Sequence, residues 1–148
     1  MGIKQLEKLE KDGFYISAPE GTSMLPMIRA GRDVVKVEKL FRNPERYDLV
    51  MYIGNNGQGI IHRVINAYDD YCIICGDNCW RYEHVDNKQI KGIVTSFYRN
   101  GVWHDINEKG YKTYVHTWVD FIFVRRVLFN IRDKSRYLIK RVKKGRKN

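Results

Sequence analysis

The segment YDLVMYIG (47–54), followed by NNGQ and GIIHRVINA (59–67), decides the fold. Both apolar runs are rich in Val, Ile and Tyr, which favour strands. The linker between them contains the Asn-Gly signal of a tight turn. We therefore predict an antiparallel hairpin in the middle of the chain.

Strands are also predicted on both sides of this hairpin, from short alternating or β-branched runs bounded by turn residues. These runs are FYIS (14–17), DVVKVEKL (33–40), YCIICG (71–76) and a pair within IKGIVTSFYRNGVWHD (90–105) that turns at Asn100-Gly101. A short helix is expected over residues 3–11, and a structured loop over 19–31. The fold class is thus predicted to be mainly β, with residues 1–106 forming one β-rich domain.

After Glu108 the apolar spacing changes to that of a helix. One stripe of apolar side chains comprises Phe121, Val124, Leu128, Ile131, Leu138 and Val142. Most Lys and Arg side chains of this region fall away from the stripe. Residues 107–148 are therefore predicted to form a basic, amphipathic helical extension.

The net charge of +10 is concentrated in this extension. Residues 125–148 contain eleven Lys or Arg and one Asp, whereas residues 1–124 contain sixteen basic and sixteen acidic side chains. Such a tail indicates an anionic partner. Residues 118–148 are predicted either to bind an anionic membrane surface or to pack on the body. Few aromatic residues are interleaved with the basic ones, which argues against a nucleic acid as partner.

Three cysteines, Cys72, Cys75 and Cys79, lie within eight residues. Their odd number favours free thiols and a reducing, cytoplasmic setting. Cys72 and Cys75 would lie on opposite faces of a strand and would chelate a metal poorly, so neither a metal nor another cofactor is predicted. No apolar stretch reaches the roughly 18 residues of a membrane span. We expect a cytoplasmic protein, at most peripheral at the inner membrane surface.

The loop GTSMLPM (21–27) could present a nucleophile. Gly21 permits a close turn and Pro26 rigidifies the exit, with Ser23 held between them. A hydroxyl nucleophile also needs a base and an oxyanion site, for which the N–H of Ser23 is a candidate. Taken alone, the segment is only a Gly/Pro loop that contains a serine.

His62 could supply the base. In its strand it shares a face with Ile60 and Val64, and a partly dry surrounding favours a neutral imidazole. A histidine packed in the core is the alternative interpretation. The segment CGDNCWRYEHV (75–85) adds two acids, Asp77 and Glu83, and either could accept the other imidazole N–H. Asp77 could instead bond only to the backbone of its own turn.

Taken in order, several motifs resemble those of the S24/S26 serine peptidases, which include signal peptidase I and the self-cleaving SOS-type repressors. The motifs are GTSMLP, RDVVKV, YDLVMY, IIHRVI, CGDN and KGIV, spread over roughly residues 15–98. The HRV triplet is similar to that of archaeal and endoplasmic-reticulum signal peptidases, in which a histidine replaces the bacterial lysine base. No single motif is specific, but the order and spacing of the set are.

The resemblance implies a coiled, partly barrel-like β-sheet body that hydrolyses a peptide or preprotein bond. It implies Ser23 as nucleophile, His62 as base, and Glu83 or Asp77 as the acid that orients the imidazole. Signal peptidases usually carry a serine where this chain has Gly21, so the oxyanion site would depend on the N–H of Ser23, with Thr22 as a helper. The family also implies small residues before the cut and an extended substrate along a strand edge.

Two departures from the family bear on the biological role. We find no membrane anchor ahead of the peptidase-like segment, which argues against exported preproteins as substrates. We also find no helix-turn-helix, which argues against a repressor. The alternative hypothesis is a catalytically inactive, peptidase-like module that docks on a membrane or nucleic acid through its basic tail.

Overall fold

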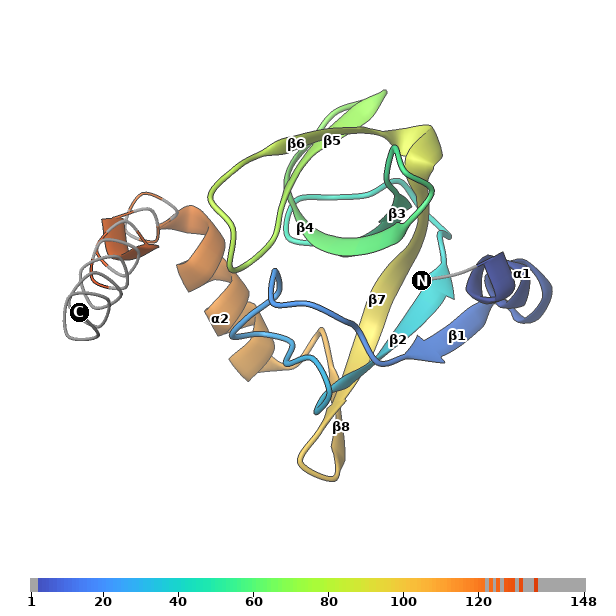
Figure 1. The fold of residues 1–148 in the computed structure, drawn as a ribbon, viewed down its shortest axis with the longest axis horizontal. Helices are drawn as coiled ribbons and strands as arrows, with labels where there is room; N and C mark the ends of the chain where they lie inside the picture. The colour runs from blue at the N-terminus through green and yellow to red at the C-terminus, as the bar shows by residue number, and fades with distance from the viewer. Residues whose placement is uncertain are drawn as a thin grey trace, which may run out of the picture.

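The computed structural model describes residues 3–121, 123, 125, 127–129, 131 and 135. Within them the main elements are one antiparallel sheet of eight strands and two helices (Figure 1). The elements are α1 (Ile3–Asp12), β1 (Phe14–Ser17), β2 (Val34–Lys39), β3 (Leu49–Ile53), β4 (Gly59–Ala67), β5 (Tyr71–Cys75), β6 (Glu83–Asp86), the 3-10 turn η1 (Asn87–Gln89), β7 (Ile90–Arg99), β8 (Val102–Asp105) and α2 (Lys109–Asp120). The prediction of a mainly β fold is confirmed.

The sheet is strongly curled. Its strand order is β1-β2-β7-β3-β4-β5-β6, and β8 pairs with β7. Register shifts interrupt the pairing of β2 with β7, β3 with β7 and β4 with β5. Each such bulge increases the local twist and bends its strand. Figure 1 shows the result: the long β7 crosses the molecule, and β3 to β6 curve round to form an open ring.

The central hairpin forms as predicted. β3 pairs with β4 so that Val50 lies opposite His62. The turn is closed by a 2.8 Å hydrogen bond from the N–H of Gly54 to the carbonyl of Gln58. Gly57 adopts a φ of +75°, a conformation that glycine reaches without steric cost. The hairpin at Asn100-Gly101 and the first helix are also confirmed. The strand β6 was not predicted from the sequence.

The buried apolar side chains of the described residues form three clusters. One buries the Ser23 loop through Met24, Met27 and Ile28, together with residues of α1, β2 and β7. A second fills the ring between β3, β4 and β5. A third joins α2 to the body, where Val115 and Val119 pack on Ile65 and Cys75. The first helix of the predicted extension therefore shares a core with the β-rich domain.

The described residues after α2 differ from the predicted stripe in which side chains they bury. Of the predicted stripe, Phe121, Leu128 and Ile131 are exposed, while Val124, Leu138 and Val142 lie outside the described residues. The side that packs on the body carries Arg125 and Phe129. The described residues of the predicted stripe are therefore exposed, and this part of the helix contacts the body through other side chains. In the part of the chain that the structure describes, no helix is long and apolar enough to cross a membrane.

Candidate active site

The Ser23 loop (residues 21–27) is a compact turn that is anchored in the core by its buried side chains. Hydrogen bonds from the N–H of Leu25 to the carbonyl of Thr22 and from Ile28 to Met24 close it on itself. Met24 is buried, whereas Gly21 and Thr22 are exposed at the rim. Gly21 has a φ of +82°, which a residue with a side chain adopts only at a cost. The half-buried Ser23 is thereby held at the surface of a rigid support.

The turn at Gly76-Asp77-Asn78 brings the Ser23 loop to His62. Asn78 binds the loop through two hydrogen bonds. Its N–H donates to the carbonyl of Ser23 at 2.7 Å, and its side-chain amide donates to the carbonyl of Thr22 at 2.9 Å. A Cβ on Gly76 would lie 2.7 Å from the Ser23 carbonyl oxygen and 3.0 Å from Nε2 of His62. The 2.7 Å contact with a backbone oxygen is too close for a side chain, and the 3.0 Å contact is tight, so the site favours glycine here. The carbonyl oxygen of Ser23 and Nε2 of His62 are thus separated by at most the sum of these two distances.

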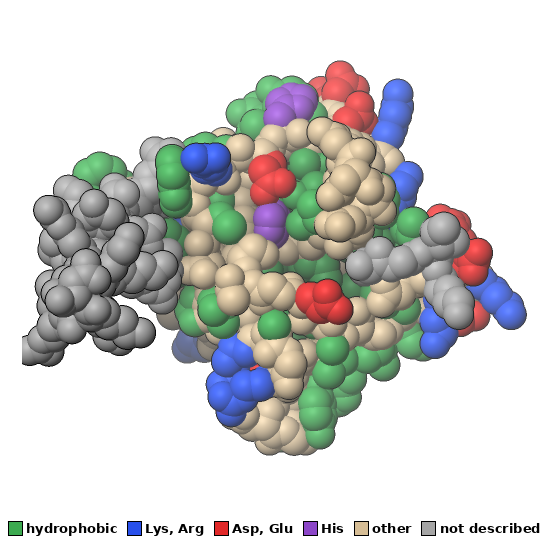
Figure 2. All heavy atoms as spheres, in the orientation of Figure 1, with side chains coloured by type: hydrophobic (Ala, Val, Ile, Leu, Met, Phe, Trp, Pro, Cys, Tyr) green, Lys and Arg blue, Asp and Glu red, His purple; other side chains and the backbone are tan. Residues whose placement is uncertain are grey.

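The other ring nitrogen of His62 contacts Glu83. Nδ1 lies 2.7 Å from Oε1 of Glu83, and the hydroxyl of Tyr52 donates to Oε2 at 2.5 Å. His62 is nearly buried, while the side chain of Glu83 is 38% exposed. On the face shown in Figure 2, a histidine and an acidic side chain accordingly lie side by side near the centre. Of the two candidate acids, Glu83 is therefore the one that contacts His62.

Hydrogen bonds hold Glu83 in its charged form. The bond from His62 lowers the pKa of Glu83, burial opposes this, and the bond from Tyr52 lowers the pKa further, so that it lies below the ordinary glutamate value. Burial, together with this carboxylate, raises the pKa of Tyr52. Tyr52 therefore stays protonated and serves as a donor. The arrangement fixes a proton on Nδ1 and leaves Nε2 free to accept one.

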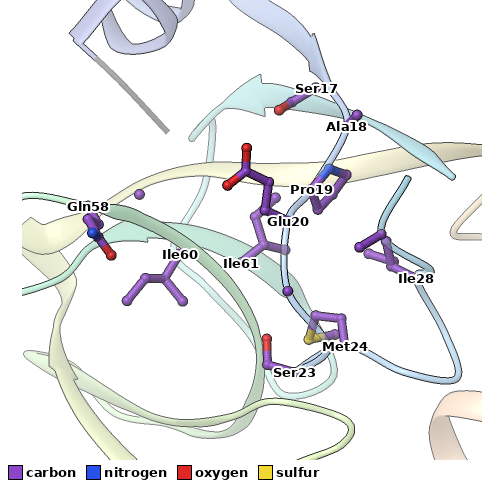
Figure 3. A pocket seen from close by; sticks show the side chains of 13 residues that line it. Ser17, Ala18, Pro19, Glu20, Ser23, Met24, Ile28, Gln58, Ile60 and Ile61 are labelled. Carbon is purple, nitrogen blue, oxygen red and sulfur yellow. The ribbon is translucent and has the colours of Figure 1, made fainter. Parts of the chain in front are cut away.

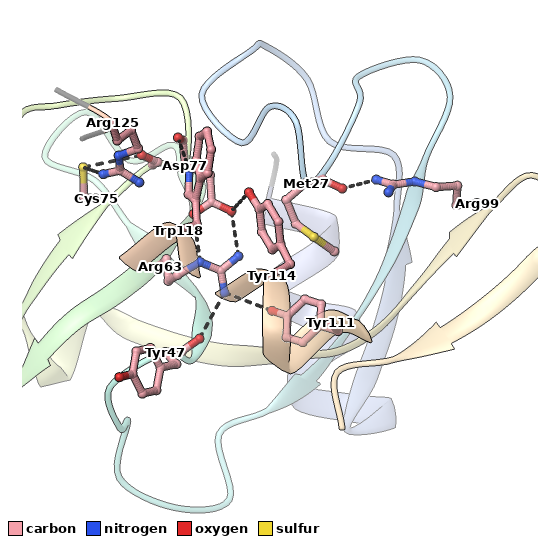
Figure 4. A network of polar contacts seen from close by, with 11 residues as sticks. Met27, Tyr47, Arg63, Cys75, Asp77, Arg99, Tyr111, Tyr114, Trp118 and Arg125 are labelled. Atoms are coloured by element: carbon pink, nitrogen blue, oxygen red, sulfur yellow. Dashed lines mark hydrogen bonds and ion pairs between the residues drawn. The ribbon is translucent and has the colours of Figure 1, made fainter. Parts of the chain in front are cut away.

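Asp77 does not take the orienting position that was considered for it. It pairs with Arg63 through two parallel bonds of 2.8 and 2.7 Å, and both side chains are fully buried. Tyr114 and Trp118 of α2 donate to the side chain and the carbonyl of Asp77 (Figure 4). Arg63 also donates to the hydroxyl of Tyr111. Asp77 thus ties β4, the Gly76–Asn78 turn and α2 together, and the suggestion that it orients His62 is not supported.

A cleft of about 290 Å³ opens beside Ser23. One wall is the end of β1 with the connection that follows it, residues 17–21, and the other is Gln58 with the beginning of β4, residues 58–61. In Figure 3 the hydroxyl of Ser23 points into this space, which the side chain of Glu20 lines from the first wall. Ile28, Ile60 and Ile61 make much of the lining apolar.

Both walls of the cleft offer strand edges. β1, whose last residue Ser17 lines the cleft, is the terminal strand of the sheet, and among the described strands it pairs with β2 alone. The pairing of β4 with β5 begins at Arg63, so residues 59–62 extend beyond it. An extended chain in the cleft can therefore meet backbone donors and acceptors on two sides.

Two residues beside this site were not identified from the sequence. Tyr52 could have been found from the hairpin register, since it pairs with Ile60 and is thus a diagonal neighbour of His62 on the same face. Cys79 has no such signal: its Sγ lies 3.0 Å from the position of a Cβ on Gly76. All three cysteines are free thiols, as predicted. Among the described residues, no cluster of His, Cys, Asp and Glu could hold a metal ion.

The depressed pKa of Glu83 predicts a pH-dependent effect of Glu83→Gln on stability. Because the native pKa lies below that of the unfolded chain, ionised Glu83 stabilises the fold above the unfolded value, about 4.3. This contribution is lost as the pH falls through the native pKa. Wild type should therefore exceed the variant near neutral pH, by no more than about 1 kcal/mol because the carboxylate is partly exposed. The difference should vanish in acid.

Urea unfolding of both proteins across the acid range measures this difference. Glu7→Gln, on the exposed side of α1, controls for the loss of a surface carboxylate. A difference that grows as the pH is lowered would contradict the proposed role of the His62 and Tyr52 hydrogen bonds.

In comparisons with known proteins, no family model matches the chain, and neither a curated protein nor a solved structure matches it.

Proposed function

We propose that this protein is a serine endopeptidase of the signal-peptidase-like type, which cleaves a peptide or preprotein bond. The observation that carries the proposal is the contact of His62 with Glu83 through Nδ1, while Nε2 faces the Ser23 loop. An acid on one imidazole nitrogen and a serine loop at the other is the arrangement of a Ser-His-acid triad. In the S24/S26 resemblance the same three positions carry the nucleophile, the base and the orienting acid.

In the proposed reaction, the oxygen of Ser23 attacks the carbonyl carbon of the scissile bond while Nε2 of His62 takes its proton. The imidazolium is stabilised by Glu83 and then protonates the leaving amine, which breaks the C–N bond and leaves an acyl-enzyme. A water molecule, activated by the same nitrogen, hydrolyses the ester and restores Ser23. The developing oxyanion would be bound by the N–H of Ser23, with Thr22 as a helper.

The substrate is proposed to lie extended in the cleft. Its backbone would pair with the free edge of β1 on one side and with the beginning of β4 on the other. Small side chains before the cut, as the family resemblance implies, are compatible with the modest volume beside Ser23. The scissile carbonyl would then come to rest at the Ser23 hydroxyl.

A fluorophosphonate, which reacts only with activated hydroxyl groups, tests the proposal directly. We expect stoichiometric labelling of wild type at Ser23, no labelling of Ser23→Ala, and much slower labelling of His62→Ala because the base is lost. Ser96→Ala, a serine of β7 away from the cleft, is the matched control and should be labelled like wild type.

Mass spectrometry of the labelled protein locates the modified residue. Equal labelling of Ser23→Ala would remove Ser23 from the mechanism. A folded wild type that is neither labelled nor active on any peptide would favour the alternative, a catalytically inactive binding module.

A further inference from the structure

Several described helical residues after α2 present large apolar side chains to solvent. Five large apolar side chains between residues 121 and 131 are 42–74% exposed, namely Phe121, Phe123, Val127, Leu128 and Ile131. Phe123, Val127 and Ile131 recur every four residues, so they share one face of the helix, and Leu128 adjoins them. We call Phe123, Val127, Leu128 and Ile131 the apolar face.

The side turned toward the body carries an arginine. Arg125 and Phe129, also four residues apart, are 2% and 8% exposed. Arg125 donates to Sγ of Cys75 at 3.3 Å, and the ring of Phe129 meets Trp118 edge-on. In Figure 1 the described residues beyond α2 (orange-red) lie to the side of the molecule, away from β7. Among its described residues, this helix thus places a cation beside Phe129 on the buried side and four large apolar side chains on the exposed side, which is unusual for an amphipathic helix.

Exposed apolar side chains are common when they are scattered, but a cluster on one helix face marks a contact surface. The charge of the same region limits what can cover it. Residues 125–148 carry eleven Lys or Arg against one Asp, while the rest of the chain is neutral. A second copy would bring an equal positive charge to the same place, which opposes self-association. A nucleic acid would satisfy the charge but would leave the apolar face without a complementary surface.

We infer that this face docks the protein on an anionic lipid surface. An interfacial helix inserts apolar side chains at the boundary of the acyl chains while neighbouring Lys and Arg side chains meet the anionic headgroups. The buried Arg125 and Phe129 fix the helix to the body and so hold the apolar face outward. Binding would be peripheral and would fall with rising salt, since the electrostatic part is screened. The inference does not depend on the proposed peptidase activity.

Co-sedimentation of the full chain with lipid vesicles tests the inference. We expect wild type to bind vesicles of phosphatidylcholine and phosphatidylglycerol, to bind phosphatidylcholine alone far more weakly, and to dissociate as salt is added. The combined variant Phe123→Ser, Val127→Ser, Leu128→Ser and Ile131→Ser should lose about a hundredfold in partitioning, because four apolar contacts with the bilayer are removed.

A matched control removes exposed apolar side chains elsewhere: Phe41→Ser with Val102→Ser and Trp103→Ser should bind like wild type. Thermal unfolding checks that each variant is folded, and Phe123→Ser alone, the most exposed position, serves if the combined variant is not. Undiminished vesicle binding by the serine variant would overturn the inference. Equal binding to neutral vesicles, or no vesicle binding together with self-association that the variant abolishes, would overturn it as well.

Discussion

Ser23→Ala is expected to lower kcat for peptide hydrolysis by at least about 10⁴-fold, because the proposed nucleophile is lost while the cleft and the proposed base remain. His62→Ala should cost a similar factor. In the proposed mechanism the two residues act in one proton transfer, so the double variant should be no slower than the slower single variant. Ser23 lies at the surface of a supported loop and is not part of the buried core, so its variant should remain folded.

Single-turnover cleavage of an extended peptide library, followed by mass spectrometry, measures these rates. The control is again Ser96→Ala, which should cleave at the wild-type rate. Additive losses for Ser23→Ala and His62→Ala would mean that the two side chains act independently. In that case the triad interpretation would fail even if each residue were needed.

The strands that could be predicted are those whose side chains alternate or form a dense apolar run between turn residues. β4 was predicted with its exact bounds because GIIHRVINA combines β-branched residues with an Asn-Gly turn before it. β6 was missed because Glu83–Asp86 is only four residues long and mostly polar. It is formed by pairing with the edge of β5, and no local pattern reports that.

The site could be predicted only in part, because it too depends on how the strands pair in the folded sheet. The sequence indicated Ser23 and His62 as candidates. It did not decide between Asp77 and Glu83 as the acid beside His62, since both lie in the same short segment. Which acid faces the imidazole depends on the curl of the sheet: β6 carries Glu83 across to His62, while the turn after β5 directs Asp77 toward the opposite face of β4. Arg63, the partner of Asp77, is the next residue after His62 in the sequence, but its full burial could not be predicted from the sequence.

Asp77→Ala is expected to lower the free energy of unfolding by about 3–5 kcal/mol, because it leaves the fully buried guanidinium of Arg63 without its counter-charge. A loss of this size is a large part of the total stability of a small domain, about 5–15 kcal/mol. The hydroxyl of Tyr114 would lose its acceptor as well. Asp77→Asn keeps the shape and part of the hydrogen bonding. Its free energy of unfolding should therefore lie between those of wild type and Asp77→Ala, and it should remain folded.

Urea unfolding separates this structural role from a catalytic one. Asp70→Ala, at an exposed turn, is the matched control and should change the unfolding free energy little, since only its backbone carbonyl is used, by Asn87. Glu83→Gln should show the opposite pattern to Asp77→Asn, with a large loss of activity and a small loss of stability, because Glu83 is partly exposed and contacts His62. If Asp77→Asn were as stable as wild type but inactive, Asp77 would have to act on His62. The buried pair with Arg63 predicts instead that Asp77→Asn loses stability first, and activity only as the Gly76–Asn78 turn releases the Ser23 loop.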